Sequence, residues 1–151
     1  MFSKSPTDFG SCSLLPPDMW VPPNRSPITS RLYRINPPTA KQVDAVLEKF
    51  LAAGLIQHST SSWASPVVVT PKKSGGIRIT VKYKKLNTLI IPGQLPISRV
   101  DEVLDTLCTR RISSFFDLVS FFYQKTVHKD TIHLTTFCTP TRLFECLGMP
   151  Q

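Results

Sequence analysis

The chain has 151 residues, of which 41% are hydrophobic and 19% charged, and its net charge of +8 comes from 18 Lys and Arg against 10 Asp and Glu. These values fit one ordinary globular domain and exclude wholesale disorder. The basic excess favours a polyanionic partner, nucleic acid before an anionic membrane, although a merely basic soluble domain accounts for the charge equally well.

The cysteines are scattered along the chain, at Cys12, Cys108, Cys138 and Cys146. No histidine stands near them at zinc-binding spacing, so we expect reduced thiols in a reducing compartment. The first ten residues lack the apolar core of a signal peptide, and no run reaches the ~18 apolar residues of a membrane span. We therefore expect a soluble intracellular protein with no membrane partner, and the sequence does not distinguish cytoplasm from nucleus.

The first elements are a leader and a helix. Residues 1–38 are rich in proline, which predicts a leader that is extended or disordered and does not pack. A helix is predicted next, because Thr39 and Gln42 form a capping box after Pro38 and Gly54 supplies a stop. Apolar residues at helical spacing form its predicted buried face: Val43, Val46, Leu47, Phe50 and Leu51.

A β-hairpin is predicted after this helix. Residues 66–71 form an apolar run, residues 77–84 alternate apolar and polar side chains, and Ser74-Gly75-Gly76 supplies the turn. A second helix is predicted after Ser98, and its apolar stripe consists of Val100, Val103, Leu104 and Leu107. Further strands are predicted over residues 112–116, 135–139 and 143–147, and the fold class is α+β.

The hairpin is the most basic stretch of the chain, and residues 72–85 contain no acid. Its cations are Lys72, Lys73, Arg78, Lys82, Lys84 and Lys85. Arg binds phosphate through a bidentate fork and Lys acts as a point charge, so this stretch is a candidate site for triphosphate or template phosphates. From the hairpin alone, a solvated edge strand whose lysines discourage aggregation is the simpler alternative.

Asp117 is the candidate metal ligand. It follows the apolar residues 112–116, and metal-assisted phosphoryl transfer uses an aspartate placed at the end of a strand together with further carboxylates. Taken singly, Asp117 is equally well a helix N-cap, and the aromatic residues around it are core packing by default.

The order of the motifs is more specific than any one of them. Together they closely resemble the reverse transcriptase of gypsy-type LTR retrotransposons, over about four-fifths of the chain. The matching blocks are Tyr33-Arg34, Gly54-Leu55-Ile56, Ser59 and Ser61 with Trp63-Ala64-Ser65-Pro66-Val67-Val68, Lys72-Lys73-Ser74-Gly75-Gly76-Ile77-Arg78, Leu86-Asn87, Phe116-Asp117-Leu118-Val119-Ser120 with Gln124, and residues 135–151.

This resemblance implies a right-hand polymerase, with fingers over residues 39–111 and the first part of the palm over residues 112–151. It implies RNA-directed DNA polymerase activity, with an RNA or DNA template-primer and deoxynucleotides as partners and Mg²⁺ as cofactor. The implied site residues are Asp117 and the Leu118 carbonyl for magnesium, Arg78 with Lys72 or Lys73 for the triphosphate, Phe122 as a ribose-excluding gate under the sugar, and Gln151 beside the nucleotide.

The chain also departs from the family pattern. The Tyr-x-Asp-Asp hairpin that supplies the family's remaining carboxylates is not among these residues, and one carboxylate with a carbonyl cannot hold two ions ~3.5–4 Å apart. Lys82 stands where the family has Asp or Asn, and Phe121 where its nucleotide pocket has Gly or Ser. We therefore expect a truncated segment that is inactive alone.

Two alternatives stay open. One is a non-catalytic, basic nucleic-acid-binding module that uses residues 72–85, and the other is completion of the chain in trans or by a downstream exon. The strand expected before Asp117 would lack its palm neighbour, and the stripe of the second helix would lack cover. We therefore also expect self-association through this open palm edge.

Overall fold

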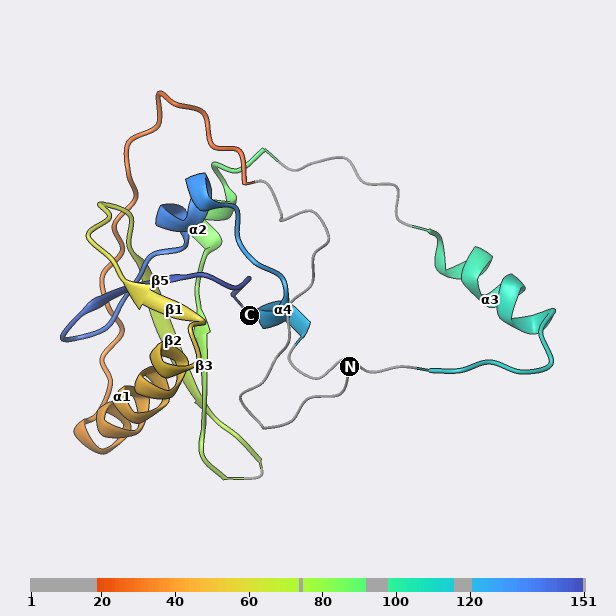
Figure 1. Cartoon of the computed structure of the whole chain (residues 1–151), viewed down its shortest axis with the longest axis horizontal. Coiled ribbons are helices and arrows are strands. Elements are labelled where there is room, and N and C mark those ends of the chain that lie inside the picture. Colours follow the sequence, from red (N-terminus) through yellow and green to blue (C-terminus); the bar gives the residue numbers. More distant parts are fainter. Residues whose placement is uncertain (1–18, 74, 92–97, 116–120, 151) are drawn as a thin grey trace.

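A computed structural model of the chain describes residues 19–73, 75–91, 98–115 and 121–150 (Figure 1). Its helices are α1 (Pro37–Ala52), α2 (Lys84–Asn87), α3 (Val100–Cys108), α4 (Phe121–Gln124) and the 3-10 helix η1 (Lys129–Thr135). Its strands are β1 (Ile56–His58), β2 (Ser65–Pro71), β3 (Ile77–Val81), β4 (Phe137–Cys138) and β5 (Leu143–Cys146). The strands form a five-stranded sheet in the order β1-β5-β4-β2-β3, so the predicted α+β class is confirmed.

Helix α1 begins differently from the prediction. Asn36 precedes the helix and makes no side-chain cap hydrogen bond, so the predicted capping box of Thr39 and Gln42 is wrong. Pro37 and Pro38 occupy the first two helical positions instead. Proline has the helical φ built in and no N–H, so two of the donors that a capping side chain would satisfy do not exist.

The end of α1 follows the prediction. Gly54 has a φ of 67°, its N–H donates to the Leu51 carbonyl at 3.0 Å, and the Leu55 N–H donates to the Phe50 carbonyl at 3.0 Å. This is the Schellman arrangement, whose left-handed residue is favourable for glycine. The buried face of α1 joins the main core cluster, which consists of Val43, Leu47, Leu55, Ile56, Val67, Phe137, Phe144 and Cys146.

The predicted hairpin is confirmed. Strands β2 and β3 pair antiparallel, from Val67 opposite Val81 to Pro71 opposite Ile77. Gly75 and Gly76 have φ values of 86° and 82°, which L side chains rarely adopt, and they form the turn. In Figure 1 this turn lies at the end of the sheet away from α2 and η1.

The last two predicted strands are confirmed in shorter form as β4 and β5. Strand β4 pairs antiparallel with β5 and parallel with the first two residues of β2. Strand β5 pairs with β1 on its other side. The predicted strand over residues 135–139 starts late because Thr135 is the last residue of η1.

The N-terminal segment, residues 19–36, is extended as predicted, but part of it packs. Thr29 forms a parallel bridge with Ala64, and Met19, Val21 and Ile28 pack against a second core cluster. That cluster consists of Trp63, Leu86 and Leu134. The expectation that this leader does not pack is wrong here, because its apolar side chains between the prolines cover part of the cluster.

Helix α3 confirms the second predicted helix, yet its apolar stripe is exposed. Val100, Val103, Leu104 and Leu107 are 72%, 47%, 52% and 46% exposed. In Figure 1 the helix stands apart from the sheet. No helix among the described residues is long and apolar enough to cross a membrane.

The strand predicted over residues 112–116 is wrong for its described part. Residues 112–115 are in no strand, and Ile112 and Phe115 are 87% and 93% exposed. A strand is stabilised by hydrogen bonds to a neighbouring strand, and β1 to β5 pair with one another instead of with this segment. Phe116 lies outside the described residues.

Candidate nucleic-acid interface

Three cations surround an open hollow beside the hairpin turn. Lys72, Lys73 and Arg78, here called the turn cations, line it with Thr70 and Pro71, and its volume is about 490 Å³. All three side chains are exposed, and no acidic residue lines the hollow. The site therefore presents positive charge to solvent without a local counter-ion.

The strand period places these charges. Residues opposite each other in an antiparallel pair share a face, so Arg78 lies on the same face as Thr70. Neighbours along the strand point the other way, and Ile77 and Ile79 pack against the main core cluster. One face of the hairpin is thus fixed by the core while the other carries Arg78.

Within the described residues, the turn cations form no ion pair. The ion pairs among the described residues are Arg99–Asp101, His128–Asp130 and Arg142–Glu48. An exposed cation without an ion-pair partner can bind an anionic ligand at little desolvation cost. In complexes with nucleic acids, Arg and Lys side chains bind the phosphate groups.

Lys82 does not belong to this hollow. Its Nζ donates to the Tyr33 Oη at 2.8 Å and lies 5.3 Å from the centre of the Tyr33 ring. This contact ties the N-terminal segment to the end of β3. Lys84 and Lys85 lie in α2. The basic stretch predicted as one site is therefore divided, and only the turn cations surround the hollow.

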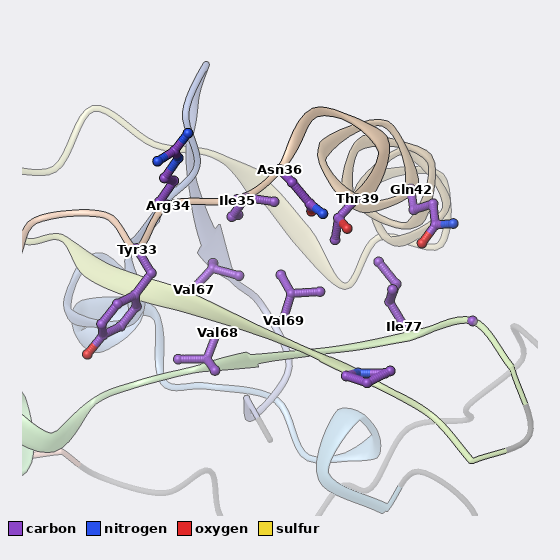
Figure 2. Close-up of a pocket in the computed structure, with 12 residues that line it drawn as sticks. Tyr33, Arg34, Ile35, Asn36, Thr39, Gln42, Val67, Val68, Val69 and Ile77 are labelled. Carbon is purple, nitrogen blue, oxygen red and sulfur yellow. The ribbon is translucent and has the colours of Figure 1, made fainter.

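A larger pocket, about 700 Å³, lies between the hairpin and the start of α1 (Figure 2). Figure 2 shows Val67, Val69 and Ile77 pointing from the hairpin toward this helix start. A helix N-terminus attracts anions through its free N–H groups, but Pro37 and Pro38 remove two of them here. This helix start therefore offers an anion fewer N–H groups than usual, and the candidate phosphate site is the hollow of the turn cations.

The remaining predicted site residues are only partly described. Phe122 lies in α4 and is 46% exposed, next to Phe121. Asp117, Leu118 and Gln151 lie outside the described residues. Within the described ranges, no group of three or more His, Cys, Asp or Glu side chains could hold a metal ion. Asp117 and Leu118 are not among the residues to which this finding applies, so the magnesium site stays a prediction.

Ser59, Ser61 and Trp63, quoted above only as parts of a motif, form a hydrogen-bonded corner between β1 and β2. The Ser59 Oγ donates to the Glu145 Oε2 at 2.7 Å and accepts the Ser61 N–H at 3.1 Å. The Ser61 Oγ donates to the His133 carbonyl at 3.0 Å and accepts the Trp63 N–H at 3.1 Å. Serines bonding the N–H two residues ahead are a turn signal readable from the sequence, so the motif has a structural role.

A polar contact of the half-buried Tyr83 joins the start of α2 to η1 and β5. The Tyr83 Oη donates to the Thr135 carbonyl at 2.6 Å and lies 3.9 Å from the Cys146 Sγ. Burial raises the pKa of Tyr83 well above its usual value and that of the Cys146 thiol to about 11. Both groups are neutral near pH 7, so Cys146 lacks the thiolate that a nucleophile needs.

The fold built from these elements is that of reverse transcriptases. A prototype foamy virus protease-reverse transcriptase matches 97% of this chain with a TM-score of 0.79 and 20% identity, over 20% of its own length. The foamy viral protease-reverse transcriptase in complex with an RNA/DNA hybrid matches 97% of this chain with a TM-score of 0.75 and 18% identity, also over 20% of its length. The predicted fold is confirmed by these matches.

The homologues of the chain are retrotransposon Pol polyproteins. It is 34% identical over 132 residues to the retrovirus-related Pol polyprotein from transposon 297 of Drosophila melanogaster, which covers 84% of this chain and 12% of that protein. It is 32% identical over 120 residues to the transposon Tf2-3 polyprotein of Schizosaccharomyces pombe, over 80% of this chain and 9% of that protein. The chain thus spans about a tenth of these relatives. No protein-family model matches it.

Proposed function

We propose that the chain is the fingers and the first part of the palm of a gypsy-type reverse transcriptase, and that its turn cations bind phosphates of nucleic acid. The observation that carries this proposal is the hollow at the hairpin turn, whose described lining has three cations in no ion pair with another described residue and has no acid. The reverse-transcriptase fold and the homology to retrotransposon Pol polyproteins support it. Solved neighbours include complexes with double-stranded DNA and with an RNA/DNA hybrid.

Each site residue has a role in this proposal. Arg78 would hold a phosphate with its fork while Lys72 and Lys73 add point charges, either on the template or on the triphosphate of a deoxynucleotide. Phe122 would lie under the sugar and Gln151 beside the nucleotide. Asp117 and the Leu118 carbonyl would contribute oxygen ligands to magnesium, whose charge would offset that of the phosphates.

We propose further that a polypeptide of these 151 residues binds nucleic acid without polymerising. Two-metal phosphoryl transfer needs several carboxylates around ions ~3.5–4 Å apart, and the catalytic motif present here contributes Asp117 alone. Phe121 adds a benzyl group where the family pattern has Gly or Ser. The second candidate function is a nucleic-acid-binding module that binds no deoxynucleotide. It uses the same turn cations.

Salt dependence tests the binding proposal. Each phosphate neutralised by a cation releases counter-ions, so replacing Lys72, Lys73 and Arg78 by Ala should reduce the slope of log affinity against log salt by about 2–3. Fluorescence anisotropy with a labelled oligonucleotide, titrated at several salt concentrations, measures this slope. The matched control replaces the exposed cations Lys41, Lys49 and Arg110 by Ala and should keep the parental slope.

A hairpin variant with the parental slope would show that the turn cations are not the binding surface. The proposal that the chain does not polymerise is tested separately, by primer extension on an RNA template with Mg²⁺ or Mn²⁺. Template-dependent incorporation that disappears in Asp117→Asn would overturn it. Binding of a deoxynucleotide that is lost with the turn cations would favour the reverse-transcriptase site over the simple binding module.

We also propose that the chain self-associates. The route expected from the sequence was an open strand edge, but residues 112–115 form no strand. The exposed stripe of α3 is the surface that supports self-association instead.

A further inference from the structure

A separate pocket lies between the N-terminal segment and η1. Its volume of about 460 Å³ falls within the ~300–1,000 Å³ of ligand sites. It shares no lining residue with the hollow of the turn cations. In Figure 1, η1 lies at the end of the sheet away from the hairpin turn, so the two sites are at opposite ends.

Trp20 is the unusual residue of this pocket. Its side chain is 54% exposed, whereas Trp63, which also lines the pocket, is 8% exposed and belongs to the second core cluster. The Trp20 backbone is held in place, because its carbonyl accepts the Ile91 N–H at 3.2 Å and its neighbours Met19 and Val21 pack on that cluster. An indole presented to solvent on a fixed support provides a stacking platform for a planar ring.

The polar lining suits a nucleobase with its phosphate. Arg25, His128 and His133 line the pocket and are exposed, and Arg25 follows a turn closed by its own N–H to the Pro22 carbonyl at 3.2 Å. The Arg fork matches phosphate, and imidazole nitrogens match the donors and acceptors of a base edge. Asp130 is the one acid among the described lining residues, and one of its oxygens lies 3.6 Å from the His128 Nδ1. Its second carboxylate oxygen can accept from the amino group of a base.

We propose that this pocket binds an unpaired nucleobase of single-stranded nucleic acid, with the base stacked on Trp20 and a neighbouring phosphate at Arg25. The inference rests on the proposed function in one respect, that the chain binds nucleic acid. An apolar peptide is the competing occupant, but the net charge of +8 and the Arg and His lining favour a polyanion. Stacking is indifferent to sequence, because every base has a π-face.

Indole fluorescence tests this site directly, because the chain has 2 Trp residues and Trp63 is buried. The 151-residue protein is titrated with a single-stranded oligouridylate and with a blunt duplex of equal length. The single strand should quench the emission, and the duplex should not, because its bases are already paired and stacked. Trp20→Phe should remove the quenching and keep the affinity, since a phenyl ring still stacks.

Trp20→Ala should weaken binding of the single strand roughly tenfold, as expected for losing one stacked base. It should leave the salt slope unchanged, because no phosphate contact is lost. The matched control is Leu32→Ala, a 39% exposed apolar residue of the same segment that does not line the pocket. Thermal unfolding shows whether each variant folds. If Trp20→Ala does not fold, the comparison of the parent with Trp20→Phe still tests the site.

Parental affinity in a folded Trp20→Ala, or equal quenching by the duplex, would overturn the inference. If the turn-cation variant lowers the salt slope in the same series, the proposed function stands and only this site fails. If the parent binds no nucleic acid at low salt, both fail. Quenching by an apolar peptide instead of the single strand would assign the pocket to a protein partner.

Discussion

Burial controls the chemistry of the residues where η1 meets β5. Cys146 and Tyr83 are held in the neutral form, and the Thr135 Oγ1 accepts the Cys146 N–H at 2.9 Å. A buried polar group is tolerated when it has a hydrogen-bond partner, and within the described residues no buried side-chain N or O lacks one. The junction is therefore stable as long as both side chains keep their protons.

Alkaline pH should destabilise this junction. Burial raises the pKa of Cys146 from 9.0 to about 11, so above pH 9 the unfolded chain loses the thiol proton more readily than the folded chain. The stability should stay constant below about pH 8 and fall between about pH 9 and 11, by up to about 2–3 kcal/mol from this thiol. Urea unfolding from pH 7 to 11 measures the fall. Cys146→Ala should show a smaller fall, and an equal fall in both proteins would exclude the thiol as a source.

The contacts of Lys82 could not be predicted from its sequence position. From the sequence, Lys82 stands at a position where the family pattern has Asp or Asn. In the structure its ammonium group bonds the Tyr33 hydroxyl and faces the Tyr33 ring. No local pattern links residues so far apart in the chain, so their contact could not be predicted. The sequence shows that residues 72–85 are basic, but it did not predict that the turn cations and Lys82 would lie in different sites.

At the level of elements, side-chain hydrogen bonds hold the corner between β1 and β2 to its neighbours. Ser59 bonds Glu145 on β5 and lies 3.0 Å from the Thr136 Oγ1, while Gln57 donates to the other oxygen of Glu145 at 2.6 Å. These bonds connect β1, β5 and the residue after η1. The corner sets where β2 enters the sheet, and β2 leads to the turn cations.

Ser59→Ala should destabilise the protein by about 1–3 kcal/mol. The substitution leaves the Ser61 N–H and one Glu145 oxygen without their partner, and unsatisfied polar groups cost about this much. The Thr136 hydroxyl keeps its bond to the His133 carbonyl. Ser62→Ala is the matched control, because Ser62 is exposed, and it should change the stability by less than about 0.5 kcal/mol. Equal unfolding midpoints in urea for the two variants would mean that the corner does not stabilise the sheet.

The elements that the sequence predicted well are those with a complete local signal. Helix α1 has its apolar period and Gly54, and the hairpin has its alternation and Gly75-Gly76, so both were predicted almost to their ends. The start of α1 was mispredicted because two valid signals competed there, and the prolines at the first helical positions prevailed over the capping box. The predicted strand is absent over its described residues, 112–115, because a strand depends on a neighbour that its own residues do not encode.

On the scale of the whole molecule, the turn cations and the exposed apolar stripe of α3 lie in different places. The turn cations lie at one end of the sheet, whereas α3 stands apart and combines an apolar stripe with Asp101, Glu102 and Asp105. None of the residues of α3 is buried. An amphipathic helix gains most of its stability by packing its apolar face, so α3 is the part of the described chain with most to gain from a partner surface.

The last prediction is that the protein self-associates through this stripe. Burying Leu104 and Leu107 against a second copy would remove from water side chains worth up to ~1.5–3 kcal/mol each when fully covered. Sedimentation velocity should show oligomers that dissociate on dilution, and Leu104→Gln with Leu107→Gln should give a monomer over the same concentrations. The control, Glu102→Gln with Asp105→Asn, changes the polar residues of the same helix and should preserve the oligomer. A parent that stays monomeric up to hundreds of micromolar, or a control that dissociates as readily as the stripe variant, would show that the stripe does not drive assembly.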